Sequence, residues 1–152
     1  MAAENYKQDL NDLNNILKGE RDEIVRMAVI AALIKERHPK CSWVGYYRSL
    51  PSGELILGPF QGPVACLRIS KGQGVCGAAA GKEQPVLVPD VHAFPGHIAC
   101  DPRARSELVL PVHDSQGRLR AVLDLDSHAP EAFSTADQDG LLPIARLTYA
   151  SG

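Results

Sequence analysis

The chain has 152 residues, of which 45% are hydrophobic and 22% charged, and its formal net charge at pH 7 is −2. This length and apolar content favour a single domain spanning residues 1–152. Lysines and arginines are scattered, which argues against nucleic acid as a partner. The N-terminus is polar and the longest apolar run, MAVIAALI, is too short to cross a bilayer. We therefore expect a cytoplasmic protein without a membrane partner.

Two helices are predicted at the N-terminal end, over about residues 5–38. The apolar residues between positions 10 and 17 recur at helical spacing, and Gly19 ends this pattern. The second helix is predicted to begin near Asp22 and to end before Pro39. It is apolar nearly all round, so we expect it to pack against a sheet. The first helix offers a surface for a homodimer.

Residues 41–128 read as a sheet and its loops. Between the third and fourth strand-like runs, GQGVCGAAAGK suits a short helix. Ser134, with Asp137 three residues later, predicts the start of a last helix over about 134–150, which Pro143 should kink or shorten. The fold class is therefore α+β, with a central antiparallel sheet of five to six strands, helices on one face and active-site loops on the other. The predicted strands are SWVGYYRSL, ELILGPF, ACLRIS, PVLVPDV, ELVLPVHD and LRAVLDLDS.

Acidic side chains share one face of the last two predicted strands. Side chains alternate along a strand, so Asp124 and Asp126 point the same way, and Glu107 lies on one face of its own strand. Acids on a sheet face usually meet solvent, but carboxylates two residues apart repel each other and favour a cationic ligand. Trp43 and Tyr47 either join the core or share the acidic face. In the second case they and the carboxylates form a pocket that suits a small molecule with an ammonium group and an apolar part.

The four cysteines are Cys41, Cys66, Cys76 and Cys100, with no CxxC pair. In a reducing compartment they are buried thiols, metal ligands or redox groups rather than a disulfide framework.

Cys100 lies in the loop FPGHIACD, just before Asp101-Pro102, which is a helix-start signal. A helix there, together with nearby cations, would favour the thiolate of Cys100, whereas Asp101 opposes it. Cys66 or Cys76 could lie beneath the loop as a resolving thiol. Two alternatives are an inert Cys100 and a metal site formed by His92, His97 and Cys100, which lacks a fourth ligand.

Six segments, in this order and at these spacings, resemble the free methionine-(R)-sulfoxide reductases, which are built on a GAF domain. The resemblance spans about residues 16–147. It departs from the family pattern in the two arginines of DPRARSELVLP and in Pro143. The segments are SWVGYY, LGPFQGPVACLRI, GQGVCGAAA, VLVPDVHAFPGHIACD, SELVLPV and AVLDLDS.

The resemblance implies an L-methionine (R)-S-oxide reductase that needs no cofactor and no metal, and that is recycled by a thioredoxin-type reductant. Cys100 would be the catalytic nucleophile, Cys66 the resolving thiol and Cys76 an auxiliary or alternative resolving thiol, while Cys41 is interpreted as structural. A non-catalytic GAF sensor of small molecules or redox state is the alternative function. The residues implied to line the substrate pocket are Trp43, Tyr47, Glu107, Asp124 and Asp126.

Overall fold

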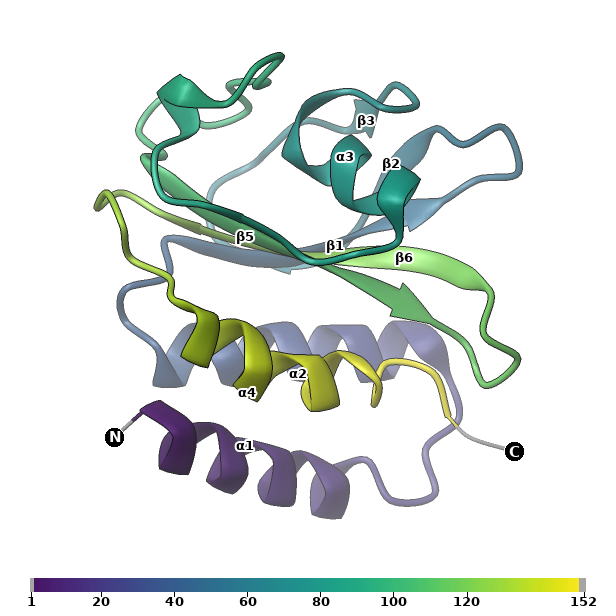
Figure 1. The fold of residues 1–152 in the computed structure, drawn as a ribbon. Helices are drawn as coiled ribbons and strands as arrows, with labels where there is room; N and C mark the ends of the chain where they lie inside the picture. Colours follow the sequence, from purple (N-terminus) through teal and green to yellow (C-terminus); the bar gives the residue numbers. More distant parts are fainter. Residues whose placement is uncertain (1, 151–152) are drawn as a thin grey trace.

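A six-stranded antiparallel sheet forms the centre of the protein. The computed structural model describes residues 2–150, and side chains from residue 5 onward. All six predicted strands are present, and their order across the sheet is β3-β2-β1-β6-β5-β4 (Figure 1). The strands are β1 (Trp43–Ser49), β2 (Leu55–Gln61), β3 (Arg68–Ile69), β4 (Val86–Val88), β5 (Ser106–His113) and β6 (Leu119–Ser127).

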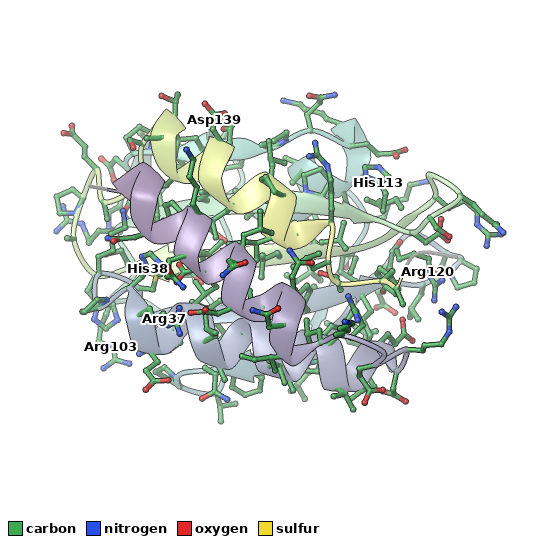
Figure 2. All side chains as sticks on the ribbon, turned by 90° about the horizontal axis from the view of Figure 1, so that it is seen from below. Arg37, His38, Arg103, His113, Arg120 and Asp139 are labelled. Carbon is green, nitrogen blue, oxygen red and sulfur yellow. A yellow bond between two sulfur atoms is a disulfide. The ribbon has the colours of Figure 1, made fainter. Side chains whose placement is uncertain are left out.

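Helices lie on both faces of this sheet, whereas the sequence predicts them on one. Helices α2 (Glu23–Arg37) and α4 (Thr135–Ala145) lie beneath the sheet in the view of Figure 1, and α1 (Ala2–Ile16) packs on them as a further layer. The short helix α3 (Gly74–Lys82) and the 3-10 turn η1 (Val91–Ala93) lie on the opposite side with the long loops. Figure 2 shows α1 and α4 from below, side by side.

The helix starts follow the capping signals of the sequence. The carboxylate of Asp22 accepts hydrogen bonds from the N–H groups of Ile24 and Val25, which confirms the predicted start of α2. Ser134 and Asp137 form the predicted capping box of α4. However, α4 ends at Ala145, short of the predicted boundary near 150, because the N–H groups of Leu147 and Thr148 bond to the carbonyls three residues back and the chain continues in tight turns.

Each face of the sheet has its own apolar core, as strand alternation requires. Val44, Leu123 and Leu125 face α2 and α4, in a cluster that also contains the free thiol of Cys41. Burial raises the pKa of Cys41 to about 12, so this thiol stays protonated and acts as a small apolar side chain. Val109 and Val122 face α3 and the loops in the second cluster.

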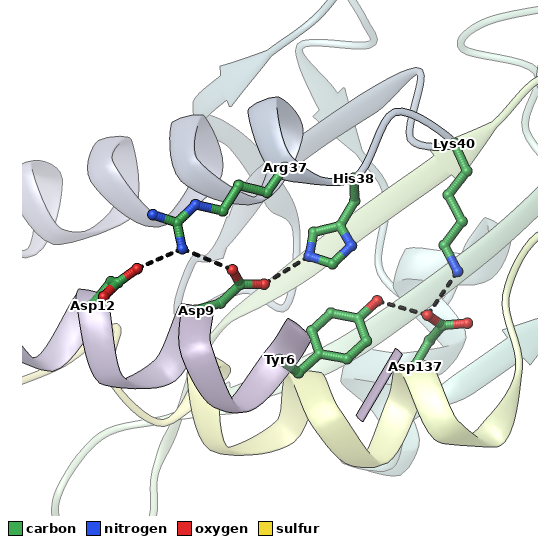
Figure 3. Close-up of polar contacts among 7 residues, drawn as sticks. All are labelled: Tyr6, Asp9, Asp12, Arg37, His38, Lys40 and Asp137. Atoms are coloured by element: carbon green, nitrogen blue, oxygen red, sulfur yellow. Dashed lines mark hydrogen bonds and ion pairs between the residues drawn. The ribbon is translucent and has the colours of Figure 1, made fainter. Parts of the chain in front are cut away.

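Helix α1 is attached to α2 by a partly buried polar cluster (Figure 3). Asp9 Oδ2 lies 2.7 Å from His38 Nε2, and Arg37 donates to the other Asp9 oxygen at 3.0 Å and to Asp12 at 2.7 Å. The Asp9 and His38 side chains are almost fully buried, so their polar atoms have to be paired within the protein. This pairing sets the position of α1 on α2.

Tyr6 connects α1 to α4. Its hydroxyl donates to Asp137 at 2.6 Å, and its ring stacks on His38 with the ring centroids 4.7 Å apart. Lys40 donates to the same Asp137 oxygen at 2.7 Å. A Cβ atom placed on Gly140 of α4 would lie 2.6 Å from Cγ and 2.8 Å from Cβ of Tyr6, so these two helices approach as closely as a glycine allows.

Within residues 2–150, no helix combines the length and the apolar character that crossing a membrane requires.

The close approach at Gly140 gives a prediction on stability. Gly140→Ala should destabilise the protein by about 1–3 kcal/mol in a urea titration, because the held Tyr6 ring cannot move away. Gly81→Ala in α3 is the matched control: nothing lies within 4 Å of its new Cβ, and helix propensity should stabilise the protein by about 0.5–1 kcal/mol. Equal effects of the two substitutions would contradict this account of helix packing.

Candidate active site

The register of β1, β6 and β5 brings the predicted acidic and aromatic residues to one place. Trp43 pairs with Asp126 across β1 and β6, and Glu107 pairs with Asp126 from the other side, on β5. Tyr47 follows Trp43 on the same face of β1, and Asp124 precedes Asp126 on the same face of β6. The acids and the two aromatic side chains therefore share one face, opposite α2 and α4.

These residues line a small cavity between the sheet, α3 and the Cys100 loop. Its enclosed volume is about 40 Å³, enough for roughly two or three water molecules. Cys100 and Cys76 are in its wall, whereas Cys66 lies just outside and reaches it through a bond to Cys100. All five residues predicted to bind substrate are in the wall: Trp43, Tyr47, Glu107, Asp124 and Asp126.

The three carboxyl groups resist ionisation. Burial raises the pKa of Glu107 well above its usual range, and the neighbouring Asp124 and Asp126 raise it further. Burial, followed by the charge of Asp124, likewise raises the pKa of Asp126. The pKa of Asp124 is raised by burial as well, but hydrogen bonds from its neighbours oppose that rise. The group therefore holds protons that a solvated set of carboxylates would release.

One atom of this group lacks a partner. Asp124 Oδ1 is buried and accepts no hydrogen bond from the described residues, and the residue is only 5% exposed. An unpaired buried oxygen costs free energy, which a ligand with an N–H donor would recover. The arrangement therefore suits an ammonium group.

Cys76 reaches the carboxyl group from α3. Its Sγ lies 4.0 Å from Glu107 Oε2, and burial together with the nearby acids raises the pKa of the thiol well above its usual range. Cys76, Glu107 and Asp124 also place one possible ligand atom each within 4.8 Å of one another, close enough to hold a metal ion. The alternative metal site at Cys100 is wrong, since the Cys100 sulfur is bonded to Cys66.

A disulfide joins Cys66 to Cys100, 34 residues apart in the sequence, with their Cα atoms 5.2 Å apart. The polar tips of the aromatic residues hold the Cys66 segment in this position. Tyr47 donates its hydroxyl proton to the carbonyl oxygen of Cys66 at 2.9 Å, and Trp43 Nε1 donates to that of Pro63, also at 2.9 Å. Two residues of the pocket wall are thus hydrogen-bonded to the segment that carries the disulfide. The alternation of side chains along the strands did not predict this connection.

The predicted helix after Cys100 is wrong. Asp101 accepts a hydrogen bond from the N–H of Arg103, and the segment closes as a turn before β5. The Arg103 side chain pairs with Asp101, and Asp101 Oδ2 lies 3.2 Å from His128 Nε2. Helix dipoles therefore do not act on Cys100, since Asp and Pro here start a turn instead.

His97 is a pocket residue that we considered only as a metal ligand or nearby cation. It lines the cavity beside Ile98, and its buried Nδ1 has no hydrogen-bond partner among the described residues. Burial and then the charge of His92 lower the pKa of His97, so its imidazole is neutral at pH 7. Its position three residues before Cys100 in the same loop is the sequence signal that could have indicated this placement.

Comparisons with known proteins place this chain in a family. A GAF domain model matches residues 20–148. The free methionine-R-sulfoxide reductase of Escherichia coli is 42% identical over 142 residues, covering 93% of this chain and 85% of that protein. The chain belongs to the GAF-domain free methionine-R-sulfoxide reductases.

Two solved structures carry the same likeness. The free methionine-R-sulfoxide reductase of Neisseria meningitidis, in complex with its substrate, has a TM-score of 0.92 at 41% identity, covering 97% of this chain and 88% of that one. The fRMsr of Staphylococcus aureus, in complex with substrate, has a TM-score of 0.87 at 35% identity, covering 94% and 92%.

The raised pKa of Glu107 predicts how stability depends on pH. A pKa above the unfolded value stabilises the fold at low pH, and this contribution is lost as the pH rises through the folded pKa. Glu107→Gln cannot ionise, so its Tm relative to the wild type should increase between about pH 5 and pH 9. Differential scanning calorimetry measures this difference. Glu36→Gln, at an exposed position of α2, is the control and should show a constant difference; a Glu107→Gln curve parallel to the wild type would contradict the assignment.

Proposed function

We propose that this protein reduces free L-methionine-(R)-sulfoxide to L-methionine, with Cys100 as nucleophile. The observation that carries the proposal is the bond between Cys66 and Cys100 at the edge of an acidic, aromatic cavity. The substrate complexes of the related reductases support the choice of ligand. The free amino acid has the ammonium group that this cavity lacks.

Asp124 binds the ammonium of the substrate in this proposal. Its unpaired Oδ1 accepts the hydrogen bond, and the hydrogen bonds from its neighbours that oppose the rise of its pKa favour the carboxylate that an ammonium needs. The methyl group lies against the rings of Trp43 and Tyr47, whose centroids are 5.9 Å apart. The N–H groups of Ile98 and Ala99 donate no hydrogen bond to the described residues and are available for the substrate carboxylate.

The sulfur chemistry requires a thiolate and a proton source. The Cys100 thiolate attacks the sulfoxide sulfur, and the oxygen moves to Cys100 while a proton is delivered to it. Methionine leaves with its sulfur reduced by two electrons, and Cys100 becomes a sulfenic acid. Glu107 supplies the proton, because the causes that raise its pKa keep it protonated at neutral pH.

Recycling uses the second cysteine. The Cys66 thiol condenses with the sulfenic acid of Cys100, releasing water and forming the disulfide. A thioredoxin-type dithiol then reduces that bond, and Cys76 is an auxiliary thiol beneath it. The chemistry uses no metal or cofactor. The cytoplasmic location and the homodimer stay predictions from the sequence.

Cys100→Ser tests the nucleophile. The variant should lose reduction of free methionine-(R)-sulfoxide completely, because a serine hydroxyl is neither acidic nor nucleophilic enough to take its place. Methionine release is followed by chromatography with dithiothreitol as reductant. Cys41→Ser, in the core beneath the sheet, is the control and should keep turning over. If the Cys100→Ser variant still reduces the sulfoxide, Cys100 is not the nucleophile. If the wild-type protein binds the sulfoxide without reducing it, the protein is a GAF sensor.

Cys66→Ser separates chemistry from recycling. The variant should still form one methionine per enzyme molecule in a single turnover, because Cys100 is intact. It should then stall with thioredoxin, since no disulfide forms for that protein to reduce. Rapid-quench measurement of methionine gives the burst, and mass spectrometry identifies the oxidised Cys100. Normal multiple turnover would transfer the resolving role to Cys76.

A further inference from the structure

The segment around Cys66 exposes apolar side chains on either side of the disulfide. Val64 is 80% exposed and Leu67 is 66% exposed, more than any other large hydrophobic residue in the described chain. Ile24 and Val25 of α2 form another exposed apolar pair, but they are only 47% and 42% exposed and lie far from the disulfide. We call Val64, Cys66 and Leu67 the Cys66 patch.

The backbone of this segment is anchored on its inner side only. The carbonyl oxygens of Pro63 and Cys66 accept from Trp43 and Tyr47, and that of Leu67 accepts from the N–H of Leu57 at 2.9 Å. The N–H groups of residues 64–67 have no partner within the described part of the chain. The segment thus presents donors and apolar side chains to an approaching chain, while its inward contacts keep it in place.

We propose that the Cys66 patch is the docking surface for a thioredoxin-type dithiol protein, whose nucleophilic thiolate attacks Cys66 Sγ and not Cys100 Sγ. This inference rests on the proposed function, which requires the disulfide to be reduced in every cycle. The disulfide favours a dithiol protein as partner, because one dithiol completes both exchange steps in a single encounter and leaves oxidised as its own disulfide, whereas a monothiol needs a second molecule.

Access decides which sulfur is attacked. Cys100 lines the cavity between the sheet, α3 and its own loop, which is where the substrate binds in the proposed function. Cys66 is absent from the cavity wall and lies between the exposed residues of the patch. A thiolate attacks along the S–S axis from the side opposite the leaving sulfur, and in this proposal it comes from the side of the Cys66 patch, so that Cys100 leaves.

The exchange balances in two steps. The partner thiolate forms a bond to Cys66 Sγ, the bond between Cys66 and Cys100 breaks, and Cys100 leaves as the thiolate that the next cycle needs. The second thiol of the partner loses its proton and attacks the partner sulfur of the mixed disulfide. Cys66 departs as a thiolate and takes up a proton, and the partner carries away the two electron equivalents as its own disulfide.

Leu67→Ser tests the surface without touching the cavity; Val64 also borders the cavity and is left intact. The value of kcat/KM for thioredoxin should fall at least fivefold, through a higher KM. Turnover with dithiothreitol, which needs no docking surface, should stay within twofold of the wild type, as should single-turnover methionine release. Val25→Ser removes an exposed apolar side chain from α2, on the other side of the sheet, and should leave all three measurements unchanged.

A trapping experiment tests the site of attack. Thioredoxin with its second cysteine changed to serine should accumulate as a mixed disulfide with this protein, and peptide mass spectrometry should find it on Cys66. A mixed disulfide on Cys100, or equal effects of Leu67→Ser and Val25→Ser, would overturn the proposal. If dithiothreitol recycles the wild-type protein and thioredoxin does not, a thioredoxin-type protein is not the partner. If the wild-type protein turns over with neither reductant, the proposed function itself is wrong.

Discussion

Three carboxyl groups crowd together on one face of the sheet, with Glu107 and Asp124 buried and Asp126 half-buried, and the rest of the site depends on their burial and mutual repulsion. Burial and proximity raise the pKa values of Glu107 and Asp126, so the pocket stores protons. The same crowding leaves Asp124 with an unpaired oxygen. A ligand with an ammonium group relieves the repulsion, and a reaction that consumes a proton uses what is stored. The same crowding of carboxyl groups therefore accounts both for binding of the ammonium group and for the supply of a proton.

The aromatic residues connect this pocket to the redox centre. Trp43 and Tyr47 present ring faces to the cavity and use their polar tips to hold the segment that carries Cys66. The resolving sulfur is consequently positioned by the residues that would contact the substrate. Cys100 of the disulfide and Cys76 of α3 both line the cavity, and Cys76 is a protonated thiol. The sheet thus positions the loop segment of Cys66 through hydrogen bonds from two pocket residues.

Most of the fold was predictable because local signals and the tertiary structure agree. Strand alternation assigned Asp124 and Asp126 to one face, and Asp22 and Ser134 started the helices as predicted. The predictions that failed concern local sequence signals that are compatible with two different structures. Asp and Pro can begin a helix or a turn, and after Cys100 the chain turns because Asp101 bonds within the loop and lies beside His128. After Ala145 the chain continues in tight turns that a helical pattern does not distinguish from a helix, and such patterns do not say which layer a helix joins.

The sequence by itself determined the chemistry available: which residues share a strand face, how many cysteines there are, and which family motifs the chain carries. These properties depend on how far apart residues lie in the sequence. The regular geometry of helices and strands converts a separation of a few residues into a position on a face. Only the tertiary structure decided that Cys66, not Cys76, is bonded to Cys100, that Tyr47 holds the Cys66 segment, and that Glu107 and Asp124 are buried. Those facts join residues far apart in the chain, and their distances depend on how the sheet, α3 and the loops pack together.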